Sequence, residues 1–141
     1  MEPVKLDDIL RAAGLKATPR RRRVAQYLFD VGGARTPEEV WRYLRRGKRI
    51  LGLPTVYRIL EELAGIGLLT RVELADRNLR YAACGEHAAG HHHHVVCIKC
   101  GTVGVIAGCL FDRQVRAVER SSGFRITSHR LFVEGLCPRC Q

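Results

Sequence analysis

Four consecutive histidines run directly into a Cys-x-x-Cys-Gly turn, and this stretch, residues 91–101, constrains the fold more than any other. The two residues between the histidines and the first cysteine are β-branched valines, which predicts a strand that ends at that cysteine. Successive side chains of a strand point to opposite faces of the sheet. His91 and His93 would then lie on one face and His92 and His94 on the other, so we predict two metal sites, one on each face. A purification tag is the alternative explanation, but a tag is normally terminal and does not continue into a strand.

A second Cys-x-x-Cys pair lies near the C-terminal end of the sequence. Together the two pairs supply the four thiolates of a closed, tetrahedral structural zinc site: Cys97, Cys100, Cys137 and Cys140. Disulfides or free thiols are the alternative, but two identical short knuckles favour a metal site. The first residues form a charged amphipathic segment rather than a signal peptide, so we expect a cytoplasmic protein. In those reducing surroundings thiolates bind metals more often than they form disulfides.

The formal net charge is +10, which predicts a polyanionic partner, and nucleic acid fits best. All six cysteines and all six histidines follow residue 83, so the sequence divides into a basic half and a ligand-rich half. We predict a DNA-binding domain over residues 1–83, a hinge over 84–90 and a metal-binding domain over 91–141. No run of about 18 apolar residues occurs, which predicts no membrane partner, and we expect no small-molecule substrate.

Helical periodicity and capping residues predict four helices in the basic half. The first covers residues 4–15, and Thr-Pro pairs, a cap followed by a proline, begin the second and the third. Thr36 and Glu39 add a capping box at the third. The fourth begins near residue 53, and two β-rich runs, residues 68–74 and 79–83, form a hairpin after it. This order of elements predicts a winged helix-turn-helix domain.

The start of the fourth predicted helix carries candidate side chains for base recognition. An apolar stripe at i, i+3, i+4 and i+7 from Val56 faces the core, which leaves three first-turn side chains to enter a major groove: Thr55, Tyr57 and Arg58. Four arginines, residues 20–23, fill the first turns of the second helix, where the helix dipole disfavours cations. We expect DNA phosphate to compensate their charge, and a solvated charged turn is the alternative.

The ligand-rich half predicts a small α+β domain. We expect strands over residues 101–106 and 124–133, with a helix between them that begins at Cys109 or Asp112 and ends near Ser121. A domain of about 50 residues is marginally stable alone, so it needs the zinc, a dimer interface or both.

Taken together, these motifs resemble the ferric uptake regulator family of bacterial metal-sensing repressors. The resemblance rests on the histidine run with its knuckle, on Ser128-His129 followed by the closing knuckle, and on two motifs in the basic half: Gly14-Leu15-Lys16-x-Thr18-x-x-Arg21 and Gly52-Leu53-x-Thr55-Val56-Tyr57-Arg58. It implies an N-terminal winged helix, which adds Lys16 and Arg21 to the candidate DNA contacts, and a C-terminal dimerisation domain. It also implies a homodimer that binds palindromic double-stranded operator DNA when a regulatory metal is bound.

The resemblance also implies three metal sites. In the first, the four knuckle cysteines bind structural zinc. A second site matches His91, His93, Asp112 and His129. The sensory site at the hinge matches Cys84, His92 and His94.

The hinge thiol indicates which metal the sensory site takes. Iron-sensing relatives carry a carboxylate at the Cys84 position and a histidine at the Ala34 position. Because sulfur suits zinc better than iron(II) or manganese(II), the residues here resemble the zinc uptake regulator branch most, with iron(II) or manganese(II) as alternatives. Zinc-sensing relatives often carry an acidic ligand at the position of Thr70. We therefore expect the fourth ligand to be water or one of three side chains: Glu73, Asp76 or His87.

Two cysteines admit a second interpretation. Cys84 is either the sensory thiolate or a small buried apolar residue, and for Cys109 we expect the small buried apolar role. Three other functions compete with the metal-sensing repressor. A zinc hydrolase lacks support because neither the H-E-x-x-H nor the H-x-E…C-x-x-C pattern occurs, so we predict no enzyme. A peroxide sensor of the same family and a constitutive nucleic-acid-binding zinc protein are the others.

Overall fold

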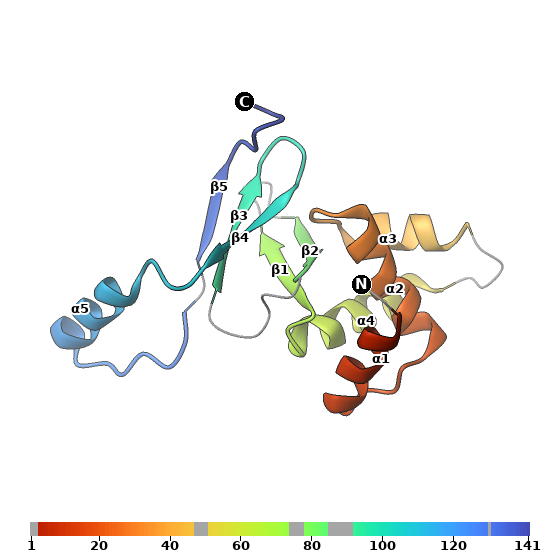
Figure 1. Ribbon diagram of the computed structural model, residues 1–141, viewed down its shortest axis with the longest axis horizontal. Coiled ribbons are helices and arrows are strands. Elements are labelled where there is room, and N and C mark those ends of the chain that lie inside the picture. Colours follow the sequence, from red (N-terminus) through yellow and green to blue (C-terminus); the bar gives the residue numbers. More distant parts are fainter. Residues whose placement is uncertain (1–2, 47–50, 74–77, 85–91, 130) are drawn as a thin grey trace.

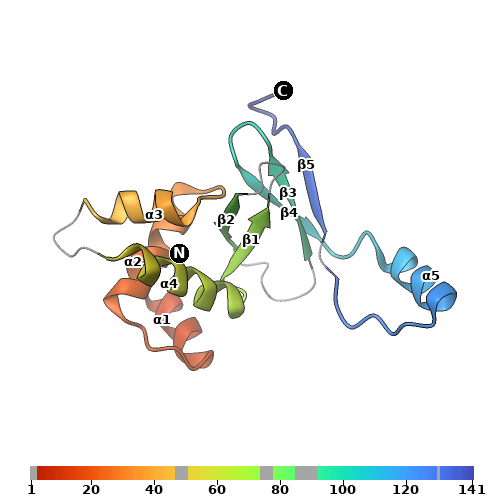
Figure 2. The same cartoon turned by 180° about the vertical axis from the view of Figure 1, so that it is seen from behind.

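The computed structural model describes residues 3–46, 51–73, 78–84, 92–129 and 131–141. Figures 1 and 2 show α1–α4 gathered at one end, the two sheets in the middle and α5 projecting at the other end. This segregation of helices and sheets confirms the predicted α+β class. The elements are α1 (Pro3–Ala12), α2 (Pro19–Val31), α3 (Pro37–Leu44), α4 (Leu53–Gly65), β1 (Leu69–Glu73), β2 (Leu79–Ala83), β3 (His92–Cys97), β4 (Val103–Ala107), α5 (Asp112–Ser122) and β5 (Phe132–Gly135).

The helix starts follow the predicted capping residues. The Thr18 hydroxyl accepts a hydrogen bond from the backbone N–H of Arg21 at the start of α2. At α3 the capping box is complete, because Glu39 N–H donates to the Thr36 hydroxyl at 3.2 Å and Thr36 N–H donates to the Glu39 carboxylate at 2.8 Å. These bonds satisfy N–H groups that a helix N-terminus otherwise leaves without a partner.

The N-terminal core draws on all four helices and on the β1–β2 hairpin. Leu10, Leu28 and Leu60, from three different helices, are each 0% exposed. Burial of one such side chain contributes about 1.5–3 kcal/mol. The apolar stripe predicted for α4 is confirmed, because its four members are the buried residues of that helix: Val56, Ile59, Leu60 and Leu63.

The hairpin is tied to α4 by one carboxylate. Strands β1 and β2 pair antiparallel, with Leu69 opposite Ala83. Glu61 of α4 accepts hydrogen bonds from the Tyr81 hydroxyl of β2 and from the Arg71 guanidinium of β1. Burial and the neighbouring Glu61 raise the pKa of Tyr81, so its hydroxyl stays protonated and donating. The predicted winged helix-turn-helix layout is thus present, and the β1–β2 wing is hydrogen-bonded to α4.

The C-terminal sheet has the strand order β4-β3-β5, which makes β3 the central strand. Strand β3 pairs antiparallel with β4 and parallel with β5, where His94 lies opposite Phe132. The prediction of a strand through the histidine run is confirmed from His92 onward, and His91 lies outside the described residues. Helix α5 ends at Gly123, whose φ of +72° suits glycine. No residue of α5 is buried.

The predicted strand over residues 124–133 is wrong for most of its length. Among the described residues of that range, only Phe132 and Val133 belong to a strand, since β5 covers Phe132–Gly135. Partial alternation of apolar residues misled the prediction, because the apolar positions are not all buried: Phe124 is 75% exposed. A strand also needs a partner, and the parallel register with β3 reaches back only to Phe132.

The N-terminal part and the C-terminal sheet meet at a small second core. Ala34, Val72 and Ala82 from the N-terminal side pack with Val96 of β3. Beside them, the backbone N–H of Ala34 donates to the carbonyl of Gly101 at 2.8 Å. Gly101 lies in the turn after β3 that carries Cys100, called here the first knuckle (residues 97–102). We call the Ala34–Gly101 bond the knuckle contact. Among the described residues, no helix is long and apolar enough to span a membrane.

Candidate metal centres and nucleic-acid surface

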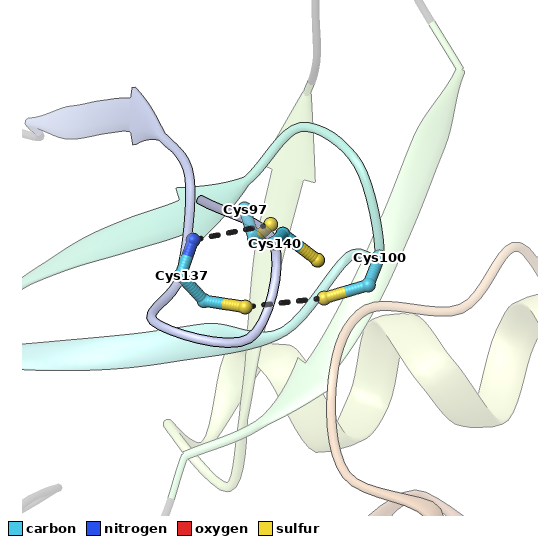
Figure 3. A group of neighbouring side chains, drawn as sticks. All are labelled: Cys97, Cys100, Cys137 and Cys140. Carbon is cyan, nitrogen blue, oxygen red and sulfur yellow. Dashed lines mark hydrogen bonds between the residues drawn. The ribbon is translucent and has the colours of Figure 1, made fainter.

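The four knuckle cysteines converge at one end of the C-terminal sheet, because β3 and β5 run parallel and Cys97 lies opposite Gly135. Cys97 ends β3, Cys100 follows in the first knuckle, and the other two come from the turn after β5 (Figure 3). Their sulfur atoms all lie within 4.8 Å of one another. The Cys100 and Cys137 sulfurs are 3.6 Å apart, close to the edge of about 3.8 Å that a zinc tetrahedron with Zn–S bonds of about 2.3 Å requires.

The backbone also prepares one of these thiols for a cation. The N–H of Cys137 points to the Cys97 sulfur at 3.4 Å. That hydrogen bond, together with backbone hydrogen bonds from Cys100 and Lys99, lowers the pKa of the Cys97 thiol to about 6, so it is a thiolate at neutral pH. Four thiolate donors at tetrahedral spacing fit structural zinc.

A second cluster joins the hairpin to the C-terminal sheet. Cys84 directly follows β2, and its sulfur lies 3.0 Å from Nε2 of His92 and 3.7 Å from Nε2 of His94. The two histidines share one face of β3, as the strand alternation predicts. Burial, together with the neighbouring charges of His92 and His93, lowers the pKa of His94 to about 4. His94 is thus a neutral imidazole at pH 7, the form that binds metals.

Cys84 is buried, yet its surroundings differ from those of a small apolar residue, because its sulfur contacts two imidazoles. Burial raises the pKa of its thiol. The cavity around it is lined also by Thr70 and Phe132. Within the described part of the chain, no carboxylate joins the three ligands, and Glu73 stands outside the cluster. The other two candidates for a fourth ligand, Asp76 and His87, lie outside the described residues.

A third cluster lies on the opposite face of β3. His93, Cys109 and His129 bring their ligand atoms within 4.8 Å of one another. Cys109 is only half-buried, so the expectation of a small buried apolar role for it is wrong. Asp112 lines the same cavity but its carboxylate is not among the three clustered ligand atoms. Sequence reasoning missed Cys109 as a member, because nothing in its local pattern says which side chains it meets.

A basic groove runs between the start of α2 and the face of α4. Arg58 is 71% exposed there. Tyr57 is also exposed and donates its hydroxyl proton to Glu38 of α3 at 2.7 Å. Lys16 is exposed just before α2. The residues that line the groove include Thr18, Arg20, Arg21, Thr55, Arg58 and Glu62.

The chain itself compensates part of the arginine run, which corrects the expectation that phosphate does so. Arg22 forms a two-pronged ion pair with Asp7 of α1, with both N···O distances at 2.6 Å. Arg21 pairs with Glu62 of α4 at 2.9 Å. These two cations orient α1 and α4 around α2, while Arg20 remains exposed in the groove.

Comparisons with known proteins agree with this architecture. The chain is 33% identical over 132 residues to the ferric uptake regulation protein of Bacillus subtilis, which covers 93% of this chain and 89% of that protein. It is 25% identical over 132 residues to the peroxide-responsive repressor PerR of Staphylococcus aureus, covering 94% of this chain and 86% of that one.

Two solved structures extend the comparison. A zinc uptake regulator complexed with zinc and DNA superposes with a TM-score of 0.81 at 21% identity, over 97% of this chain and 91% of that chain; at this identity the likeness shows the fold alone. The Vibrio cholerae ferric uptake regulator superposes with a TM-score of 0.63 at 26% identity, over 93% and 98%. The model of the Ferric uptake regulator family matches residues 12–134. The chain therefore belongs to the ferric uptake regulator family, whose members are transcription regulators and not enzymes.

Proposed function

We propose that the protein is a zinc-responsive repressor that binds palindromic operator DNA as a homodimer. One observation carries this proposal, the cluster of Cys84, His92 and His94. It contains one sulfur and two imidazole nitrogens within 4.8 Å of one another. A thiolate beside imidazoles favours zinc over iron(II) or manganese(II), which prefer oxygen-rich sites.

The position of this cluster supports a sensory role. Cys84 follows the wing hairpin, whereas both histidines belong to the C-terminal sheet. A metal held by all three residues therefore fixes the DNA-binding domain (residues 1–83) relative to the dimerisation domain (91–141) across the hinge (84–90). Metal binding selects the arrangement in which it is best coordinated, and we propose that this arrangement binds DNA. The four knuckle cysteines hold structural zinc in this proposal.

The basic groove supplies the DNA-binding surface. Arg58, Thr55 and Tyr57 lie on α4, which would enter the major groove, and Lys16 would contact phosphate. Arg21 is engaged by Glu62, so its part is to set the angle between α2 and α4.

Unburied apolar surface in the C-terminal part supports the homodimer. Helix α5 buries none of its residues in the described chain. Large apolar side chains along and beside it are exposed: Leu110, Phe111, Val118 and Phe124. A second copy of the chain would cover them, as a unit this small requires. Static light scattering should give twice the chain mass, and Val118→Glu should reduce it, whereas a monomeric wild type would contradict the proposal.

The function is tested by DNA binding at controlled free metal. A high-affinity operator is first selected from random duplex DNA by the zinc-loaded protein. Its affinity is then measured by fluorescence anisotropy in buffered free zinc, iron(II) and manganese(II), without oxygen and at one salt concentration, because phosphate contacts make affinity salt-dependent. We expect zinc to switch binding on at the lowest free concentration. Activation by iron(II) or manganese(II) alone would instead assign an iron or peroxide sensor.

Substitution of the hinge thiol sharpens this test. Cys84→Ala should raise the free zinc needed for DNA binding by more than about tenfold, since even the loss of a partner behind a ligand costs 10–100-fold in metal affinity. The dimer should stay folded by circular dichroism. Thr70→Ala is the matched control, because it lines the same cavity but offers no thiolate. An unchanged zinc response in Cys84→Ala would overturn the sensory role.

A further inference from the structure

The cluster on the far face of β3 has a donor set that the family resemblance does not assign. The resemblance places Asp112 with the histidines of this face. The geometry points to Cys109 instead: we propose that His93, Cys109 and His129, the third cluster, form a metal site with a thiolate ligand. The ion that this site would bind is a divalent cation of borderline softness, such as zinc(II).

Three separate segments deliver the three side chains. His93 comes from the central strand β3 and is 2% exposed. Cys109 lies in the turn between β4 and α5, and His129 precedes β5. Convergence of a buried imidazole, a second imidazole and a thiol from three segments is the usual construction of a metal site and is not explained by the apolar packing of the sheet.

The distances fit tetrahedral zinc. The Cys109 sulfur lies 3.1 Å from Nε2 of His129 and 3.5 Å from Nε2 of His93. With Zn–N bonds of about 2.0–2.1 Å and a Zn–S bond of about 2.3 Å, tetrahedral angles give an S···N edge of about 3.6 Å. One cation therefore reaches all three atoms after only small side-chain shifts.

The backbone around Cys109 orients its sulfur. The N–H of Phe111 points to that sulfur at 3.3 Å, the kind of hydrogen bond that fixes a metal ligand from behind. Asp112 is the next residue, at the exposed start of α5. Its carboxylate neighbours the Cys109 thiol but is not among the three ligand atoms that lie within 4.8 Å of one another. We therefore assign to the thiolate the place at the metal that the resemblance gives to the carboxylate.

A thiolate changes what this site selects. Two imidazoles and a carboxylate accept iron(II) and manganese(II), whereas two imidazoles and a thiolate favour zinc. Both faces of β3 then present the same donor set, one sulfur with two histidines. The inference rests on this geometry and holds whether or not the hinge cluster controls DNA binding.

Cobalt(II) is the probe, because a cobalt–thiolate bond gives a near-ultraviolet charge-transfer band and a cobalt–carboxylate bond does not. Cobalt(II) is titrated without oxygen into the full-length protein that retains its structural zinc. Cys84→Ala removes the hinge thiolate, and we expect one charge-transfer band to remain and to saturate at one cobalt per chain. Cys84→Ala with Cys109→Ala should lose that band and bind cobalt at least about tenfold more weakly.

The matched variant is Cys84→Ala with Asp112→Asn, which should keep the band. A band that persists without Cys109, or that is missing while Cys109 is present, would overturn the assignment. So would loss of binding in the Asp112 variant with unchanged binding in the Cys109 variant. Single substitution of Cys109 in the otherwise natural chain should remove about half of the charge-transfer intensity, which gives a second readout if the double variants fold poorly. None of these readouts involves DNA.

Discussion

Replacement of Gly33 by alanine should open the knuckle contact without touching any metal ligand. Gly33 lies between α2 and α3 with a φ of +71°, and a Cβ there would sit 2.9 Å from the carbonyl oxygen of Gly101. That oxygen is the acceptor for the Ala34 N–H. The atoms that the methyl group meets are backbone atoms of the first knuckle, which cannot swing aside as a flexible side chain would. The alanine therefore strains the bond on which the contact depends.

The magnitude has two parts that can be separated. A left-handed φ costs alanine about 1–2 kcal/mol wherever it occurs in the chain. The methyl overlap adds about 1–3 kcal/mol, as overpacking typically does, but only while the loop touches the knuckle. The lost hydrogen bond opposes separation by about 1 kcal/mol. This bond is lost on opening in the wild type as well, so the overlap alone changes the equilibrium. An overlap of about 1 kcal/mol raises the population with an open contact roughly 5-fold, and one of about 3 kcal/mol raises it about 150-fold.

Amide hydrogen exchange of Ala34, resolved by NMR, measures that population directly. Exchange at Ala34 should accelerate by about this factor in Gly33→Ala, relative to core amides such as that of Leu28. Gly14→Ala is the matched control, because its φ is +73° and no atom lies within 4 Å of its added Cβ. It carries the backbone strain without the overlap, so Ala34 should keep its protection. Equal protection of Ala34 in the two variants would refute the reasoning.

Three further predictions follow from the sites and caps. Cys97→Ser should remove the structural zinc and with it the folded dimer, measured by elemental analysis and light scattering; a zinc-loaded dimer would contradict the four-thiolate site. Because burial raises the pKa of the Cys84 thiol, zinc must displace a proton, and the apparent zinc affinity of the hinge should rise about tenfold per pH unit through neutrality. His94, with a pKa of about 4, adds no further slope above about pH 6, so pH-independent affinity would exclude the thiolate. Thr36→Ala should lower the free energy of unfolding by about 1 kcal/mol in urea titrations, and no change would mean that the capping box is not formed in solution.

Short-range signals explain which parts of the fold the sequence predicts well. The capping box at Thr36 and the apolar stripe of α4 involve residues within a few positions of one another, so their outcome depends little on the rest of the chain. The alternation along β3 is equally local. Each of these predictions is confirmed.

Long-range partners explain the failures. Segment 124–133 alternates in part, but only its end finds a partner strand, and no local pattern carries that register. The arginine run looked unpaired because Asp7 and Glu62 approach it only after α1 and α4 have packed on α2. Cys109 meets His93 and His129 across three chain segments, so its surroundings become visible only in three dimensions.

Because β3 is the central strand, its register against β4 and β5 decides which histidine serves which metal site. A slide of one residue against β4 and β5 would exchange the two faces of the strand. Histidines would still lie on both faces after such a slide, so the histidine run itself does not distinguish the correct register from the shifted one. That discrimination falls to the end of the strand, where Val96 is fully buried and Cys97 must meet three other thiolates. Zinc binding by the four cysteines would thus select the correct register of β3, because the four thiolates meet only in the register that places each histidine at its own metal site.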